Sequence, residues 1–416
     1  MPEPATPEIL YGTQTALGVA NFGPGRRRIA DVPALVRNYG WVKAAAARAN
    51  VRLGVITAEQ GAAIEAASLE IAAGTHNEQF PTALVLGGGG TTTNMNANEV
   101  IAARASQIAG TTIHPNDHVN ASQSTNDSYP TAMALTVREL AEAPLAALDS
   151  LVEAFDAKGS EYSDTVRLGR TCLQDAVTLT VGQTHRSHGT ALRRVASELR
   201  AAVEGLDEVA LGATIIGSGI GAPEGYREIA VAELGSLVGR TLTPSADLFD
   251  SLAHLDPYLN IAQAGARAAI TMSKIAADLR LLASGPAGGI GELVLPSVQA
   301  GSSIMPGKIN PVIPEYVMQL SYRVRGRAHT VEMAVAAGEL ELNIMEPIIV
   351  DSLIDIFEDI ASAATAFEEK CVSGITWDGP RLATNVSNAF DRWVVMAAEE
   401  GYDAATAAVK KLRAGE

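Results

Sequence analysis

The sequence predicts an all-α protein: an elongated central helical bundle with smaller N- and C-terminal helical regions. Aromatic residues make up only 5% of the 416 residues while alanine and aliphatic residues abound, which favours closely packed helices over aromatic-rich strands. Apolar residues also recur at spacings of three and four along most of the chain. A chain of this length can bury a large core, so we expect two or three structural regions.

The apolar periodicity marks the helices in chain order. The expected segments are 32–53, 58–72, 98–107, 129–157, 189–211, 258–283, 313–336 and 346–371. The later segments run for many turns and carry small residues on several faces. Such helices must be buried by neighbouring helices or by other subunits, so we expect a homo-oligomer.

Composition and charge narrow the class of partner. The formal net charge of −16 argues against nucleic acid and anionic membranes, because both bind basic surfaces. Cys172 and Cys371 are too few for a disulfide framework and are ordinary in a reducing compartment, so we expect a cytoplasmic protein. The sequence shows neither a signal-peptide pattern nor a membrane span, and we expect neither.

Polar connectors separate the expected helices. Residues 86–96, 114–130, 169–185 and 301–312 are rich in Gly, Thr, Ser and Asn. Individually such residues cap helices, but long connectors in a compact protein are usually functional. Together they indicate one composite site.

The connector 301–312, GSSIMPGKINPV, is the most informative of these. Gly301 and Gly307 allow it to open and close as a lid. Its polar side chains suit a carboxylate, with one positive charge, one amide and two hydroxyls: Lys308, Asn310, Ser302 and Ser303. A plain surface turn would use the same residue types, so the other connectors decide between the two interpretations.

Several blocks, in order, resemble the aspartase/fumarase superfamily. They are GGGGTTTNMNANEV at 87–100, HPNDHVNASQSTNDSYPTAM at 114–133, GRTCLQDAV at 169–177 and the lid, with YGTQT at 11–15 and ELNIMEP at 341–347. The resemblance covers most of the chain up to about Cys371. We divide the chain into an N-terminal domain with the first substrate-binding block (1–125), a central long-helix bundle with the lid (126–375) and a shortened C-terminal helical domain (376–416).

The resemblance implies a lyase that eliminates an amine or water from a succinyl unit to give fumarate. Removing the proton beside a carboxylate creates a doubly charged aci-carboxylate, and one preorganised donor for such charge contributes about 3–4 kcal/mol. Ser302 matches the general base, and Lys308 and Asn310 match the residues that hold the carboxylate. A serine is a weak base, so Ser302 needs activation by backbone donors and by Lys308. The resemblance implies no cofactor.

The other blocks match anion-binding residues of the family. Thr171 lies beside the reacting centre, with Cys172 next to it. The remaining matched substrate-binding residues are Thr91, Ser124, Thr125, Asn126 and Ser303.

A further turn matches a secondary carboxylate-binding site. Its residues are His114, Asn116 and Asp117. The spacing of His114 and His118 would suit a metal ion, but Pro115 opposes the helix that such a pair needs. We therefore expect no metal.

Departures from the family pattern favour amine release over hydration. Cys172 stands where fumarases carry a histidine, and a thiol replaces an imidazole poorly near neutral pH. Residues 312–315 and 345–347 also look more like aspartases. We expect an aspartase-like carbon–nitrogen lyase that acts on aspartate or an aspartate derivative. Fumarate hydration and a catalytically lapsed structural relative remain alternatives.

Other departures concern the surroundings of the site. Thr184 and His185 replace a Glu-Phe pair of the family, and we expect His185 and His188 at a partly exposed helix start. The shortened C-terminal region motivates the hypothesis that a larger amine is accepted. The glycines at 87–90 do not form a phosphate loop, because no Gly-Lys-Ser/Thr follows them.

The resemblance also implies how the chain assembles. The central bundles would form the superhelical core of a homotetramer. Thr91, the second block with Thr171, and the lid would then come from different subunits at each site.

Overall fold

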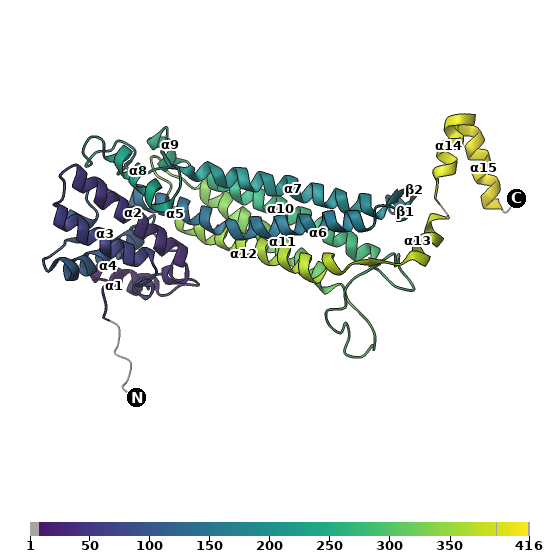
Figure 1. The fold of residues 1–416 in the computed structure, drawn as a ribbon, viewed down its shortest axis with the longest axis horizontal. Helices are drawn as coiled ribbons and strands as arrows, with labels where there is room; N and C mark the ends of the chain where they lie inside the picture. The colour runs from purple at the N-terminus through teal and green to yellow at the C-terminus, as the bar shows by residue number, and fades with distance from the viewer. Residues whose placement is uncertain (1–7, 388, 415–416) are drawn as a thin grey trace. The chain divides into compact units, whose positions relative to one another are not determined.

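The computed structural model describes residues 8–387 and 389–414. Helices dominate, and the short strands pair only two at a time, which confirms the all-α class (Figure 1). The described residues fall into two compact units. Unit 1 comprises Met1–Ala143, Glu198–Ala266 and Val324–Glu358, and unit 2 comprises Pro144–Ser197, Arg267–Arg323 and Asp359–Glu416. The boundaries of the three expected regions stay a prediction.

Unit 1 contains most of the shorter helices. They are α1 (Thr13–Phe22), α2 (Pro33–Arg52), α3 (Ala58–Ala72), α4 (Thr91–Ala109), α5 (Thr125–Leu140), α8 (Tyr226–Val238) and α9 (Leu248–Ala253). Single turns lie at Ile29–Asp31, Asn77–Gln79, Pro115–Val119 and Gly205–Asp207, and β3 (Glu208–Val209) pairs in parallel with β4 (Thr243–Pro244). The expected segments 32–53 and 58–72 are confirmed as α2 and α3.

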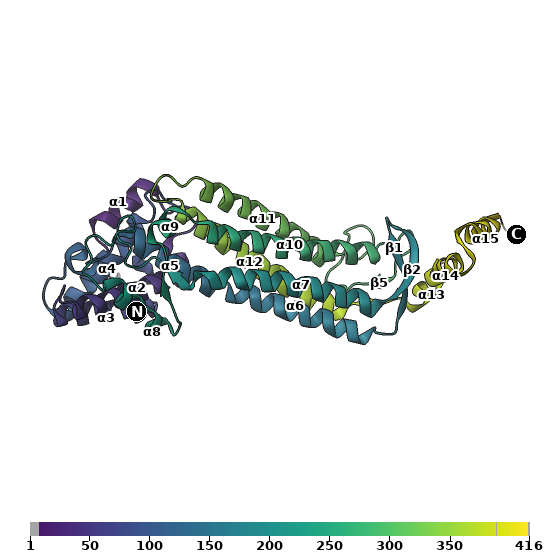
Figure 2. The same cartoon turned by 90° about the horizontal axis from the view of Figure 1, so that it is seen from above.

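Small residues set the close packing of α2 on α3, which lie side by side in both views (Figures 1 and 2). A Cβ on Gly40 would stand only 2.6 Å from the carbonyl oxygen of Ser68. Ala44 and Ala45 are fully buried. Since interiors pack as densely as organic crystals, larger side chains here would push the two helices apart.

Long helices contribute residues to both units. They are α7 (Val181–Glu204), α10 (Asp256–Leu282), α11 (Val312–Ala336) and α12 (Glu346–Lys370). The last three closely match the expected segments 258–283, 313–336 and 346–371, whereas α7 begins before the expected segment 189–211. None of the described helices combines the length and apolar character needed to cross a membrane.

The structure corrects one expected helix. The segment 129–157 is two helices, α5 and α6 (Glu142–Glu161), with a break at Ala141. Pro144 explains the break, because proline lacks an N–H and its ring clashes with the preceding turn, so a helix tolerates it best in its first turn. A new helix therefore starts at Glu142.

Unit 2 contains a hairpin that the sequence analysis treated as a polar connector. Strands β1 (Val166–Thr171) and β2 (Gln174–Thr180) pair antiparallel, with Thr171 opposite Gln174. Cys172 and Leu173 form the turn with φ values of 53° and 59°. Turns of this kind usually contain Asn-Gly or Asp-Gly, so the Cys-Leu pair gave no hairpin signal.

The C-terminal segment packs on this hairpin within unit 2. It comprises a turn at Val372–Gly374, β6 (Thr376–Trp377) paired with β5 (Leu293–Val294), and helices α13 (Gly379–Val386), α14 (Asp391–Glu400) and α15 (Tyr402–Ala414). The Asp391 carboxylate accepts hydrogen bonds from the Thr178 N–H (3.0 Å) and hydroxyl (2.8 Å). This contact fixes the start of α14 to β2.

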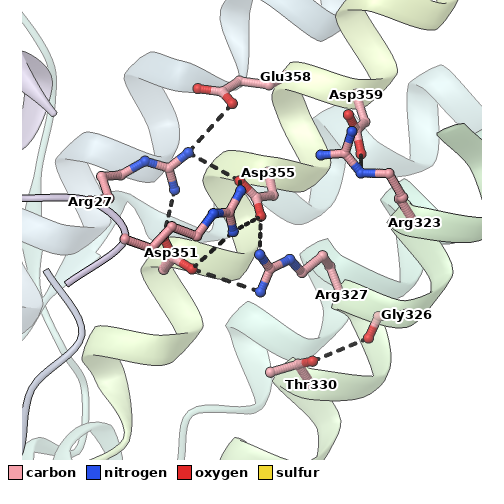
Figure 3. Close-up of polar contacts among 10 residues, drawn as sticks. Arg27, Arg323, Gly326, Arg327, Thr330, Asp351, Asp355, Glu358 and Asp359 are labelled. Atoms are coloured by element: carbon pink, nitrogen blue, oxygen red, sulfur yellow. Dashed lines mark hydrogen bonds and ion pairs between the residues drawn. The ribbon is translucent and has the colours of Figure 1, made fainter. Parts of the chain in front are cut away.

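An ion network ties the segment before Ile29 to α11 and α12 within unit 1 (Figure 3). Arg27 donates to Asp351 (2.5 Å) and to Asp355 (3.0 Å), and Asp355 also pairs with Arg26 and with Arg327. Burial raises the pKa of Asp355, but the hydrogen bonds from Arg26 and Arg27 and the charge of Arg327 outweigh it and hold this pKa below its ordinary value. Asp355 is therefore charged and paired at neutral pH.

Candidate active site

The lid, residues 301–312, is a loop of unit 2 that closes on itself at its neck. The Gly301 N–H donates to the Lys308 carbonyl (2.8 Å), and Asn310 Nδ2 donates to the Gly301 carbonyl (2.8 Å). A Cβ on Gly301 would stand 2.8 Å from the backbone nitrogen of Asn310, so only glycine fits there. The Lys308 side chain is exposed, and Ile304 at the tip is 85% exposed.

Ser302 is the best-supported base within this loop. Its Oγ accepts hydrogen bonds from the backbone N–H groups of Ile304 (3.3 Å) and Met305 (3.0 Å). Donors of this kind stabilise negative charge on the oxygen and so favour the alkoxide. Ser303 is more exposed than Ser302. The backbone donors that a serine base needs are present, while the catalytic role itself stays a prediction.

Thr171 and Cys172 lie at the tip of the β1–β2 hairpin, and both are exposed. Cys172 and Leu173 adopt the left-handed region, which costs an L-residue about 1–2 kcal/mol each. Backbone strain of this kind clusters at functional sites. The hairpin thus holds Thr171 and Cys172 outward at an energetic cost.

Thr91 is the first residue of α4 in unit 1. Its side chain is exposed, and its Oγ1 donates to the Gly88 carbonyl (2.9 Å). The preceding Gly90 has a φ of 83° and packs on the ring of Tyr129, where a Cβ would stand 2.5 Å from Cγ. Thr91 therefore sits among the free N–H groups of a helix N-terminus, which attract anions.

The second block forms the N-terminus of α5 in the same unit. Ser124 Oγ accepts from the Asn126 N–H (3.2 Å), and the Ser124 N–H donates to Asp127 Oδ1 (2.9 Å). Thr125 Oγ1 accepts from Asn94 Nδ2 of α4 (3.2 Å). Unit 1 therefore brings the first two blocks together, with the N-termini of α4 and α5 joined by side chains.

Asp127 is a buried acceptor that the sequence analysis missed. Its Oδ2 accepts from the N–H groups of Gly212 (3.1 Å) and Thr214 (3.0 Å), and the nearby Ile215 carbonyl accepts from Asn126 Nδ2 (2.7 Å). Burial raises the pKa of Asp127 to about 6, although the N–H donors lower it. The Ser-x-x-Asp spacing of a capping box was the available signal.

Lys43 supports the second block from inside unit 1. It is fully buried, and its Nζ donates to Asn120 Oδ1 (3.1 Å) and to Gln123 Oε1 (3.0 Å). The same Asn120 oxygen accepts from Asn94 (3.2 Å) and Asn98 (3.1 Å). Burial lowers the pKa of Lys43 to about 7. Other basic residues occur in the same helix, so the sequence did not single out this buried lysine.

The His114 turn is organised by its own backbone. His114 Nδ1 accepts from the N–H groups of Asn116 (3.3 Å) and Asp117 (3.1 Å), so the neutral ring carries its proton on Nε2. His118 Nδ1 in turn accepts from the His114 N–H (2.9 Å). The half-exposed His114 can thus offer an N–H to an anion, and its role at a secondary carboxylate site stays a prediction.

The part-buried Glu99 and the buried Asn343 fix the two remaining family blocks in unit 1. Glu99 accepts from the Gly12 N–H (2.9 Å) and the Thr15 hydroxyl (2.6 Å) at the start of α1. Asn343 accepts from the Met345 N–H (2.9 Å) and donates to the Val335 carbonyl (3.1 Å). These blocks therefore act, in this chain, as anchored structural segments.

His185 and His188 are buried, which corrects the expected exposed helix start. They are 0% and 7% exposed, and burial lowers their pKa values to about 3 and about 4. His185 Nε2 accepts from Trp377 Nε1 (3.2 Å), and Phe155 packs edge-on against His188 at 5.4 Å. Both imidazoles face the interior because α6 and the C-terminal segment cover this side of α7.

The fold and these blocks define a helical enzyme of the aspartase/fumarase type. A family model described as "Lyase" matches residues 7–326. The chain belongs to this lyase family, within the superfamily that its sequence blocks resemble.

Named relatives show the extent of the similarity. The aspartate ammonia-lyase of Pseudomonas fluorescens is 42% identical over 406 residues, which cover 96% of this chain and 85% of the relative. The crystal structure of "fumarate lyase:delta crystallin" from Brucella melitensis bound to cobalt is 41% identical with a TM-score of 0.94, covering 98% of this chain and 90% of that one. A class II fumarase from Schistosoma mansoni is 31% identical with a TM-score of 0.92, covering 98% and 89%.

Proposed function

We propose that the protein is a carbon–nitrogen lyase that releases ammonia, or a related amine, from aspartate or an aspartate derivative to give fumarate. The lid carries the proposal, because Ser302 Oγ receives two backbone N–H donors in the loop that also holds Lys308 and Asn310. The 42% identity with the aspartate ammonia-lyase of Pseudomonas fluorescens supports the same reaction.

Ser302 acts in this proposal as an alkoxide that takes the β proton of the substrate. The electron pair of the broken C–H bond moves into the neighbouring carboxylate, which becomes the aci-carboxylate. Lys308 and the second N–H of Asn310 stabilise that charge. Collapse of the intermediate forms the carbon–carbon double bond and breaks the C–N bond, so the substrate ammonium leaves as a neutral amine.

The other carboxylate is assigned to the helix N-termini of unit 1. Thr91 and the Ser124–Asn126 run offer hydroxyl, amide and backbone donors there. Thr171 and Cys172 border the reacting centre, and Ser303 completes the lid side. No cofactor takes part, and the reaction is placed in the cytoplasm.

The assembly proposed for this chemistry is a homotetramer in which different subunits supply Thr91, the second block with Thr171, and the lid. Exposure of the lid tip supports a covering surface, since Ile304, Met305 and Ile309 are 85%, 49% and 47% exposed. Mixing two inactive variants, Ser302→Ala and Thr91→Val, should restore partial activity if these residues come from different subunits. No recovery on mixing would mean that one chain supplies both.

Two measurements test the reaction. With aspartate as substrate, the wild type should produce fumarate, seen as a rise in absorbance. The rate of this rise should be several orders of magnitude lower for Ser302→Ala, whereas the matched Ser303→Ala variant should keep most of the turnover. Equal loss in both variants would remove Ser302 as the base. A panel of fumarate with different amines, read by product mass, identifies the leaving group.

Fumarate hydration is the second candidate, and the similarity to a class II fumarase favours testing it. Malate turnover above aspartate turnover would replace the proposed reaction. Cys172 predicts the opposite order, because a thiol handles protons poorly where an imidazole would act.

A further inference from the structure

The β1–β2 hairpin, whose first strand ends at Thr171, has little support of its own. Its two strands pair only with each other, and a two-stranded hairpin is marginally stable in water unless other elements pack on it. Thr171 is exposed, and the turn residues Cys172 and Leu173 have the left-handed backbone that L-residues rarely adopt. The position of Thr171 therefore depends on contacts that other segments make with the hairpin.

Glu292 makes one of these contacts, with β1. It is fully buried, and its carboxylate accepts two hydrogen bonds from Arg170, one from Nη2 to Oε1 (2.7 Å) and one from Nη1 to Oε2 (3.1 Å). Arg167 Nη2 lies 3.5 Å from the same carboxylate. Two parallel bonds between a guanidinium and a carboxylate fix orientation as well as distance. Because Arg170 directly precedes Thr171, Glu292 holds the end of the strand that carries Thr171.

The C-terminal segment binds the same glutamate from the other side. Asn385 Nδ2 of α13 donates to Glu292 Oε1 (2.7 Å), and the Asp378 N–H donates to the Glu292 carbonyl (2.9 Å). Burial raises the pKa of Glu292, but the hydrogen bonds from Arg170 and Asn385 and the charges of Arg170 and Arg167 outweigh it and hold this pKa below its ordinary value. Glu292 is therefore a carboxylate at neutral pH and joins α13 to the hairpin.

The C-terminal segment also holds the second strand of the hairpin. The pairing of β1 with β2 is irregular near the middle of the hairpin, and such irregularities leave backbone groups of the strand ladder unpaired. Beside this irregularity, the Ala176 carbonyl accepts from the Phe390 N–H (3.0 Å), and the Thr178 N–H donates to Asp391 (3.0 Å). Both strands of the hairpin are thus fixed to one segment, β1 through Glu292 and β2 directly.

We propose that Glu292 is a positioning residue for Thr171, and that the C-terminal segment acts on the site through Asn385 and Glu292. The proposal rests on the proposed function, because Thr171 takes part in the reaction only there. Glu292 also directly precedes β5, in the stretch of chain that leads to the lid. One buried carboxylate thus connects the hairpin, the approach to the lid and the C-terminal segment without being a group that contacts the substrate.

The reactivity of Cys172 reports on the hairpin tip independently of turnover. Cys172 is exposed, whereas Cys371 is buried and burial raises the pKa of its thiol to about 12. With iodoacetamide, followed by mass, the modification rate of Cys172 should rise about threefold or more in Asn385→Ala, because a loosened tip exposes the thiol more often. The matched Thr384→Ala variant should keep the wild-type rate, since this exposed threonine of α13 donates only to Pro380 of its own helix.

Glu292→Gln is the stronger perturbation of the same contact. It keeps the shape of the side chain but removes the charge that holds Arg170, so it should raise the modification rate of Cys172 above that of Asn385→Ala. Asn385→Ala leaves the pair of Arg170 and Glu292 intact, and therefore tests the proposal even where Glu292→Gln does not fold. A wild-type rate in a folded Asn385→Ala protein overturns the proposal.

A double-mutant cycle separates positioning of Thr171 from a general structural role. Asn385→Ala should lower kcat about tenfold in the wild-type background and change it by less than about twofold in a Thr171→Val background, where the positioned group is already absent. An equal fall in both backgrounds would mean a general loss of structure and would overturn the proposal. Full turnover of Thr171→Val would instead refute the role of Thr171 in the proposed function, and the modification rate of Cys172 would still decide whether Asn385 and Glu292 hold the tip.

Discussion

The glycine run before α4 offers a graded test of how the first block is built. Gly87 has an ordinary φ and open space around its Cβ position, Gly88 has a φ of 91° and open space, and Gly90 has a φ of 83° and faces the Tyr129 ring. Alanine therefore adds no strain at position 87 and backbone strain alone at position 88. At position 90 it adds backbone strain together with a steric clash.

The expected magnitudes follow from these two effects. An L-residue in the left-handed region costs about 1–2 kcal/mol, so Gly88→Ala should destabilise by that amount. Tyr129 is fully buried, and overpacking a core costs about a further 1–3 kcal/mol, so Gly90→Ala should lose about 2–5 kcal/mol. Gly87→Ala should be neutral or slightly stabilising, because alanine reduces the entropy of the unfolded chain.

Urea unfolding and steady-state turnover together measure the series. Displacing Tyr129 moves the first turn of α4, so Gly90→Ala should also lose the Thr91 contact, worth about 1.5–3 kcal/mol, or roughly tenfold to a hundredfold in kcat/KM. Equal stability of Gly88→Ala and Gly90→Ala would contradict the expected clash between a Cβ at position 90 and the Tyr129 ring. Equal turnover of all three variants would contradict the expected effect of Gly90 on the position of Thr91.

Other substitutions test the supporting structure. Asp355→Asn should lower the free energy of unfolding in urea by about 1.5–3 kcal/mol, because it removes the buried carboxylate that accepts hydrogen bonds from the more exposed Arg26 and Arg27, whereas Glu358→Gln at an exposed position should change it by at most about 0.5 kcal/mol. Glu99→Gln should destabilise the start of α1 by about 1.5–3 kcal/mol, seen as faster hydrogen exchange at Gly12 and Thr15, and unchanged exchange would contradict the cap. Burial lowers the pKa of His188 from 6.5 to about 4, so the unfolded chain binds a proton in this window that the folded chain does not. The free energy of unfolding should therefore fall by about 3 kcal/mol from pH 6.5 to pH 4, and a His188→Phe variant with the same slope would contradict this.

Long-range pattern made most of the helices predictable. Segments such as 313–336 and 346–371 carry many turns of consistent periodicity, which is the most reliable signal in a sequence. The errors occurred where one residue overrides the pattern. Pro144 interrupts an otherwise continuous period, and the hairpin turn at Cys172 uses residues that rarely adopt a left-handed backbone.

The sequence blocks of the candidate site could also be recognised in the sequence. The buried residues that hold these blocks in place could not. Lys43 and Asp127 are buried charges, and burial depends on contacts with segments far away in the chain. His185 and His188 were expected at a partly exposed helix start, and nothing in the local sequence indicates that Trp377 covers His185. Local pattern therefore located the reactive groups, whereas tertiary contacts decided their electrostatics.

The supporting residues of the site and its reactive residues differ in burial. This difference explains why the association of subunits matters to the proposed chemistry. Lys43, Asp127 and Glu292 are buried and hydrogen-bonded, whereas Thr91 and Lys308 are exposed. Two charges about 4 Å apart attract by only about 1 kcal/mol in water, but by about 4 kcal/mol at an effective dielectric constant of 20. An exposed Lys308 would stabilise an aci-carboxylate too weakly to make a serine useful as a base. In the proposed homotetramer other subunits would cover these groups, and the apolar lid tip provides a surface that such a cover would bury.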